Sequence, residues 1–204
     1  KDFKAEIEFD KHTFTIQDNC GGIAWNLHDY AFRMGRSSDR PPVTPGSVGV
    51  YGIGLKRAIF KMGKDCLIST QNGEHRYEVE IKPEWIDDET EDAWKIPVKP
   101  SMKSMKHDGT TIVIGDLYPG IAARFSEDAK SFQAELKRMV ATHYAYIIDK
   151  GFEVTINGDS IKPRPTRLIF SADNKQKKIP SIQPFIFKTK TEDGVEVFLT
   201  VGFT

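Results

Sequence analysis

The segment Gly49-Val50-Tyr51-Gly52-Ile53-Gly54-Leu55-Lys56 places three glycines in front of apolar residues that recur at helical spacing. Glycines at the entrance of a helix leave backbone N–H groups directed outward, and the helix dipole adds positive potential there. A phosphate group can therefore bind at this point. We predict that Gly49, Gly52 and Gly54 lie beside phosphates, with Leu55 and Lys56 in the first helical turn.

Two better-known phosphate motifs do not fit the same segment. A Walker loop requires Gly-Lys followed by Ser or Thr, whereas Gly54 is followed by Leu55 and Lys56. The dinucleotide fingerprint reads G-x-G-x-x-G, whereas these glycines read G-x-x-G-x-G. The segment therefore belongs to neither class.

Upstream, the chain reads Asp18-Asn19-Cys20-Gly21-Gly22. Residues 5–9 and 13–17 alternate as half-buried strands do, so a hairpin delivers the chain into this segment. An ionised Asp18 is acceptor-only and can accept a hydrogen bond from an exocyclic amine such as that of adenine. Glycines directly after it, including Gly22, let a flat ring approach the backbone.

A third segment reads Asp108-Gly109-Thr110-Thr111-Ile112. Residues 110–117 are apolar and β-branched enough to form a buried central strand. Thr110 opens this strand, and its hydroxyl can bond a base directly or through water. We predict that Thr110 lies on the base side of the same site.

The segment between the first two motifs, residues 35–49, is rich in Gly, Ser, Pro and charge and shows no apolar period. Loops of this length inside a compact domain are typically functional, and we predict a lid. Farther on, an apolar face over residues 132–147 predicts one long helix, and residues 152–161 predict a hairpin. After Pro163 the chain changes to short strands, which predicts domains at 1–162 and 163–204.

Composition indicates an ordinary globular protein of 204 residues, with Lys plus Arg and Asp plus Glu both numbering 29. Because the two numbers are equal, the chain lacks the excess of basic residues that is typical of a dedicated nucleic-acid-binding protein. Cys20 and Cys66 are too few for a disulfide framework, and the histidines have no metal-ligand spacing, so we expect no protein metal site. No membrane span or signal peptide is evident, and we expect a cytoplasmic protein.

The three motifs, in this order and around a lid, resemble the Bergerat-fold (GHKL) ATPases: gyrase B, MutL, the MORC proteins, the ninety-kilodalton heat-shock chaperones and the histidine-kinase catalytic domains. The resemblance spans about residues 5–160 and is nearest in motif style to the MORC, MutL and chaperone-like branch. It implies an α/β (α+β) two-layer sandwich, with helices on one face of a mixed, mostly antiparallel sheet and the nucleotide between helices and lid.

Carried over residue by residue, the resemblance makes Asp18 the adenine-reading carboxylate and Gly22 the second glycine of that motif. Gly49, Gly52 and Gly54 match the phosphate-side glycines, with Leu55 and Lys56 beside them. Thr110 matches the base-side threonine. The cofactors implied are ATP and Mg²⁺.

Two features depart from the family. Cys20 stands where the first glycine of the Asp motif is usual. The family helix that carries a catalytic Glu and a Mg²⁺-binding Asn lies upstream of the hairpin, so we expect an N-terminally truncated domain whose catalytic residues are unknown. Glu6 and Glu8 lie on a predicted strand and are not assigned as the general base.

The resemblance implies ATP hydrolysis that drives lid closure and homodimerisation, with residues 163–204 beginning a β-rich, transducer-like domain. A scaffold that holds ATP without significant turnover is the alternative. Histidine-kinase-type phosphotransfer is disfavoured, because those enzymes generally have Gly-x-Gly-Leu-Gly where this chain has Gly-Ile-Gly-Leu-Lys. A DNA or protein client, bound through other domains, is left open by fold analogy, and no membrane partner is expected.

Overall fold

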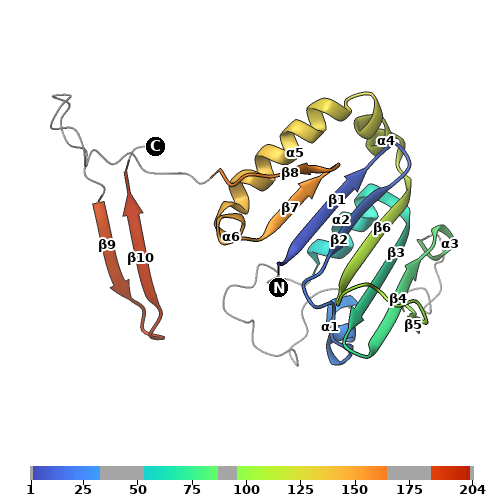
Figure 1. Cartoon of the computed structure of the whole chain (residues 1–204), viewed down its shortest axis with the longest axis horizontal. Coiled ribbons are helices and arrows are strands. Elements are labelled where there is room, and N and C mark those ends of the chain that lie inside the picture. The colour runs from blue at the N-terminus through green and yellow to red at the C-terminus, as the bar shows by residue number, and fades with distance from the viewer. Residues whose placement is uncertain (1, 33–52, 87–95, 165–184, 203–204) are drawn as a thin grey trace. The chain divides into compact units, whose positions relative to one another are not determined.

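The computed structural model describes residues 2–32, 53–86, 96–164 and 185–202 (Figure 1). The chain divides into two compact units, Lys1–Pro163 and Arg164–Thr204. Within the described ranges, no helix is long and apolar enough to cross a membrane.

The first unit is built on an eight-stranded sheet. In spatial order its strands are β5 (Val98–Pro100), β4 (His75–Ile81), β3 (Gly63–Asn72), β6 (Gly109–Leu117), β2 (Phe14–Asp18), β1 (Lys4–Phe9), β7 (Glu153–Ile156) and β8 (Asp159–Ser160). All neighbouring pairs are antiparallel except β1 and β7, which run parallel. The predicted mixed, mostly antiparallel sheet is therefore confirmed.

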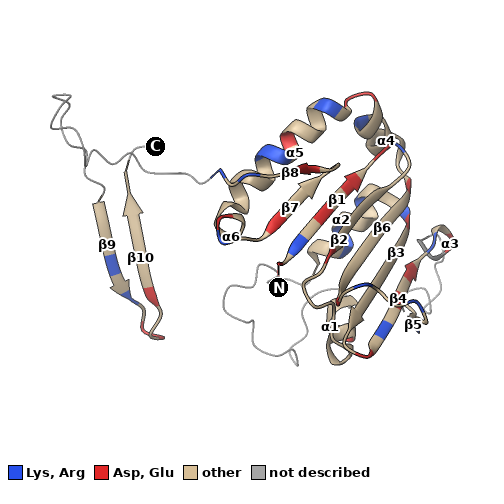
Figure 2. Cartoon of the chain, viewed as in Figure 1, with Lys and Arg blue, Asp and Glu red and all other residues tan. Residues whose placement is uncertain are grey.

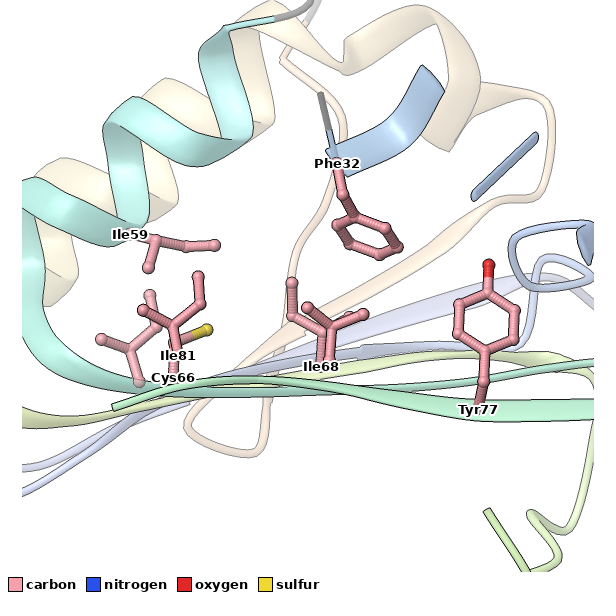
Figure 3. Close-up of a cluster of buried hydrophobic side chains, with 8 residues drawn as sticks. Phe32, Ile59, Cys66, Ile68, Tyr77 and Ile81 are labelled. Atoms are coloured by element: carbon pink, nitrogen blue, oxygen red, sulfur yellow. The ribbon is translucent and has the colours of Figure 1, made fainter. Parts of the chain in front are cut away.

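Helices supply the second layer of this unit. They are the 3₁₀ helix η1 (Trp25–Leu27) and the α-helices α1 (His28–Phe32), α2 (Gly54–Met62), α3 (Pro83–Ile86), α4 (Pro119–Ser126), α5 (Ala129–His143) and α6 (Ala145–Asp149). Figure 3 shows α1 and α2 on one side of the sheet, with Phe32 and Ile59 pointing toward Ile68 and Cys66. The arrangement confirms the predicted two-layer α/β fold.

Two apolar clusters hold the layers together. The first lies beneath α1 and α2 and consists of Phe32, Ile59, Cys66, Ile68, Tyr77, Val79, Ile81 and Ile114. The second lies beneath α4 and α5 and consists of Ile7, Phe9, Phe125, Val140, Val154, Ile156 and Ile161. Phe14, Met62 and Leu117 pack against both clusters, so both belong to the same face of the sheet. Burial of this apolar surface is the main force that joins the layers.

Charged residues of both signs are distributed over the first unit outside its two apolar clusters. Figure 2 shows basic and acidic residues interspersed along β1 and α5. The ion pairs are on the surface; Lys4 and Glu6, for example, are 3.0 Å apart with both side chains substantially exposed. Such pairs contribute little to stability, and the fold depends on the apolar clusters.

One helix begins late and another is divided. After Gly22 the first helical turn begins only at Trp25, because Ile23 is held on the sheet: its N–H donates to Thr70 Oγ1 at 2.8 Å and its carbonyl accepts from Tyr77 Oη at 3.0 Å. The long helix expected over 132–147 divides at Tyr144, which leaves the helical region at φ −107° and ψ 12°. The spacing of apolar residues does not reveal this break, because the apolar residues of α6 continue nearly the same helical period as those of α5.

The second unit, as far as it is described, is a β-hairpin. Strands β9 (Phe185–Lys190) and β10 (Glu196–Val201) pair antiparallel around a turn in which Gly194 has φ +81°. Lys188 pairs with Glu196 at 3.6 Å and also lies over the Phe198 ring at 4.8 Å. The assignment of residues 163–204 to a transducer-like domain stays a prediction.

Candidate nucleotide-binding site

Asp18 lies at the end of β2, on the face of the sheet that the helices cover. The β2–β6 ladder ends at the pair Gln17–Thr111, and strand alternation puts Asp18 on the same face as Phe14 and Ile16. Its Oδ1 accepts the Cys20 backbone N–H at 2.8 Å. This bond fixes the carboxylate, and a carboxylate retains further acceptor capacity for a ligand amine.

The turn after Asp18 requires glycine at one position for steric reasons. Gly21 and Gly22 both have left-handed backbones, with φ +104° and +69°. A Cβ at residue 22 would lie 2.0 Å from the Gln71 carbonyl oxygen and 2.9 Å from that of Gly109. No side chain fits there. Cys20, in contrast, is exposed and does not have a positive φ, so the turn does not need a glycine at its position.

Gly109 joins the third motif to the first. A Cβ at this residue would lie 2.0 Å from the Asp18 carbonyl oxygen and 3.0 Å from Asn19 Cα. The chain therefore packs backbone against backbone at this corner. The structure brings Asp18, Gly22 and Thr110 together, although they come from segments far apart in the sequence.

Thr110 belongs to a hydroxyl pair that the sequence did not reveal. It is 9% exposed and lies opposite Thr70 of β3, and the two Oγ1 atoms are 3.1 Å apart. Thr70 is 2% exposed and also contacts the Ile23 N–H and the Gly109 carbonyl. A threonine in an alternating strand is ordinary, so only the β3–β6 register reveals this partner.

A second group that sequence reasoning missed holds the glycine turn in place. Asp108 accepts from Gln71 Nε2 and from the Gly73 N–H, both at 3.0 Å, and its backbone carbonyl accepts the Gly21 N–H at 3.1 Å. Asn72 Nδ2 donates to the Gly21 carbonyl at 2.7 Å. These bonds connect the β3–β4 turn to both motifs, so the site rests on the end of β3 as well as on β2 and β6.

The predicted phosphate side lies at the start of α2. This helix begins at Gly54, and its N-cap residue, Ile53, makes no side-chain capping hydrogen bond. Leu55 packs against the first apolar cluster. Lys56 is only 4% exposed, and its Nζ donates to the Ala31 carbonyl at 2.9 Å, which joins α2 to α1. The other two predicted glycines, Gly49 and Gly52, and the predicted lid lie outside the described residues.

Two groups near the site have a raised pKa. Partial desolvation raises the pKa of the Cys20 thiol, and the neighbouring Asp18 charge, together with a hydrogen bond to Asp18, raises it further. Burial also raises the pKa of Tyr77 to about 12. Tyr77 therefore stays a neutral donor to the Ile23 carbonyl at physiological pH.

A cavity of about 260 Å³ lies on the opposite face of the sheet. Its lining consists of Lys4, Glu6, Gln17, Asp18, Asn19, Met105, Lys106 and His107. Lys4, Glu6 and Gln17 alternate with the core residues of β1 and β2 and so point away from the helices. The cavity therefore opens on the other side of the sheet from Thr110 and α2, and Asp18, at the end of β2, contributes to its lining as well.

These features fit a purine nucleotide. A fixed carboxylate and a hydroxyl lie at one corner, the adjoining backbone admits no side chain at Gly22, and the N-terminus of α2 lies on the same face. Among the residues that the structure describes, no group of three or more His, Cys, Asp or Glu side chains is arranged to hold a metal ion.

The mixed sheet with helices packed on one face is the fold of a Bergerat-type nucleotide-binding domain. A family model described as histidine kinase-, DNA gyrase B-, and HSP90-like ATPase matches residues 3–111. The chain belongs to this family, and its membership indicates ATP binding. The model groups several branches, so placement with the MORC and MutL proteins stays a prediction. No curated protein matches the chain.

Proposed function

We propose that the first unit binds ATP between the end of β2 and the start of α2. Asp18 accepts a hydrogen bond from the adenine amine, and Thr110 contacts the base directly or through water. The single observation that carries this proposal is the corner at Gly22, where neighbouring backbone atoms leave no room for a Cβ beside the fixed Asp18 carboxylate.

The triphosphate, in this proposal, lies at the N-terminus of α2. Gly54 and Leu55 present backbone N–H groups there, and the predicted Gly49 and Gly52 complete the cradle. Lys56 adds positive charge one turn into the helix. Mg²⁺ would neutralise the phosphate oxygens, which are hard ligands of the kind it prefers.

We further propose that the intact protein hydrolyses ATP and couples this to lid closure over residues 35–49 and to homodimerisation. The support is family membership and the position of β9 and β10 after the first unit, where a transducer domain would begin. We assign no general base: Glu6 points away from the helix layer and pairs with Lys4. A DNA or protein client in the cytoplasm is consistent with this function.

The test is a pair of assays on the full chain with Mg²⁺. ATP should raise the melting temperature in a concentration-dependent manner, since a ligand that binds only the native state stabilises it. Release of inorganic phosphate supports the ATPase, and saturable binding without release supports the scaffold alternative. Transfer of the γ-phosphate to protein would instead indicate phosphotransfer. A melting temperature that ATP leaves unchanged would contradict the proposal.

A further inference from the structure

Thr70 is buried in the middle of the site and uses its whole hydrogen-bonding capacity there. Its Oγ1 accepts the Ile23 N–H at 2.8 Å, donates to the Gly109 carbonyl at 3.1 Å and lies 3.1 Å from Thr110 Oγ1. A hydroxyl has one hydrogen and two lone pairs, so three bonds saturate it.

This saturation fixes the direction of the bond between the two threonines. The Thr70 hydrogen is used on the Gly109 carbonyl, and one Thr70 lone pair is used by the Ile23 N–H. Thr110 must therefore donate its own hydrogen to the second lone pair of Thr70. In the reverse direction Thr70 would no longer donate to the Gly109 carbonyl, so these buried groups would make one hydrogen bond fewer, which is costly.

Thr110 then presents only lone pairs to a ligand. Asp18, which continues the β2–β6 register next to Thr110, is also an acceptor when ionised. Two acceptors side by side suit the amino group of a 6-amino purine, which donates N–H, and oppose the carbonyl oxygen that a 6-oxo purine carries at the same position.

We propose that Thr70 is a specificity-determining positioning residue: by holding the Thr110 hydroxyl as an acceptor, it makes the site select 6-amino over 6-oxo purine nucleotides. This inference rests on the proposed function, in which Asp18 and Thr110 read the base. Thr70 itself does not touch the nucleotide and acts through Thr110.

The test compares the affinities of the full chain for ATP and for inosine triphosphate, which carries a 6-oxo group in place of the amine. The wild type should prefer ATP. Thr70→Val removes the hydroxyl at nearly constant volume and frees Thr110 to donate. The preference for ATP over inosine triphosphate (ITP), measured as the ratio of their affinities, should therefore fall about five- to tenfold. Thr70→Ser keeps the hydroxyl and should keep the preference. General damage to the pocket would weaken the binding of both nucleotides equally and leave the ratio of their affinities unchanged.

A circular dichroism spectrum establishes whether Thr70→Val folds. If it does not, Thr110→Val replaces it, because this change leaves the Thr70 bonds to Ile23 and Gly109 in place and should narrow the same ratio. An unchanged ratio in the variant used, while the wild type prefers ATP, overturns the role of Thr70 but leaves the proposed function intact. Equal affinity of the wild type for ATP and ITP also overturns the role of Thr70. Uptake of neither nucleotide overturns both proposals.

Discussion

The backbone carbonyl oxygen of Asp18 lies 2.0 Å from the position that a Cβ atom would occupy at Gly109. The adenine-side carboxylate and the strand that carries Thr110 are therefore joined by close backbone packing. Any residue larger than glycine at 109 forces the two strand ends apart.

Gly109→Ala should destabilise the first unit by about 2–4 kcal/mol, because backbone atoms must shift to admit the methyl group. Gly120→Ala is the matched control, since among the described residues nothing lies within 4 Å of a Cβ built there. In helix α4 that change should be neutral or slightly stabilising. Urea unfolding measures both variants. Equal stability of the two would show that the corner at Gly109 is not packed as described.

Lys56→Met should weaken ATP binding about fivefold or more while leaving adenosine binding nearly unchanged, because only the triphosphate responds to the lost charge. Lys61→Met, an exposed position on the same helix, serves as the control. Affinities for both ligands are measured by competition with a fluorescent nucleotide. An equal loss for ATP and adenosine would mean that Lys56 acts only by joining α2 to Ala31.

Stability should fall as pH rises above about 9, and Cys66 should contribute to this fall. Burial raises the pKa of its thiol from 9.0 to about 12, so the unfolded chain loses the proton first. The stabilising effect is complete below pH 9 and disappears as pH rises toward 12. The slope for one such group is about −1.4 kcal/mol per pH unit.

The Cys66→Ala variant isolates this contribution. It should be less stable than the wild type at pH 8, because it leaves a small cavity in the first apolar cluster. The difference in unfolding free energy should shrink as pH rises from 9 to 10.5, and urea titrations at each pH measure it. A difference that stays constant across this range would contradict a protonated, buried thiol.

Nucleotide should protect the predicted lid from protease. Arg36, which is followed by Ser37, is a trypsin site within residues 35–49, whereas the Arg40–Pro41 bond resists trypsin. A non-hydrolysable ATP analogue with Mg²⁺ should slow cleavage there several-fold, whereas cleavage in residues 165–184 provides an internal reference within the same chain. Mass spectrometry of the fragments assigns the cut sites. If the nucleotide analogue slowed cleavage of both segments to the same extent, this result would argue against a lid that responds to nucleotide.

Much of the fold follows from sequence pattern alone. Alternation in residues 5–9 and 13–17 predicts β1 and β2, and the Asn157-Gly158 turn predicts the β7–β8 hairpin, because these signals are local. The residue at which the helix after Gly22 begins does not follow from local pattern. It is set by bonds from Ile23 to Thr70 and Tyr77, which are remote in sequence.

In the candidate site, too, some residues can be recognised from local sequence and others cannot. Asp18 and Gly22 are recognisable because a turn after a strand selects these residue types, and the structure explains Gly22 by contact with Gln71 and Gly109. The supporting Thr70 and Gln71 could not be predicted. Nothing in a single strand shows which residue will lie opposite, and register across β3 and β6 decides that.

The most direct measurement is calorimetric titration of a Mg²⁺–ATP analogue into the wild-type chain and into Asp18→Asn. Asparagine keeps the oxygen that accepts the Cys20 N–H but presents an NH₂ group in place of an acceptor, so affinity should fall about 10- to 100-fold with folding intact. Glu8→Gln, an exposed change on β1, should bind like the wild type. Equal affinity of wild type and Asp18→Asn, or no uptake by the wild type, would contradict nucleotide recognition at Asp18.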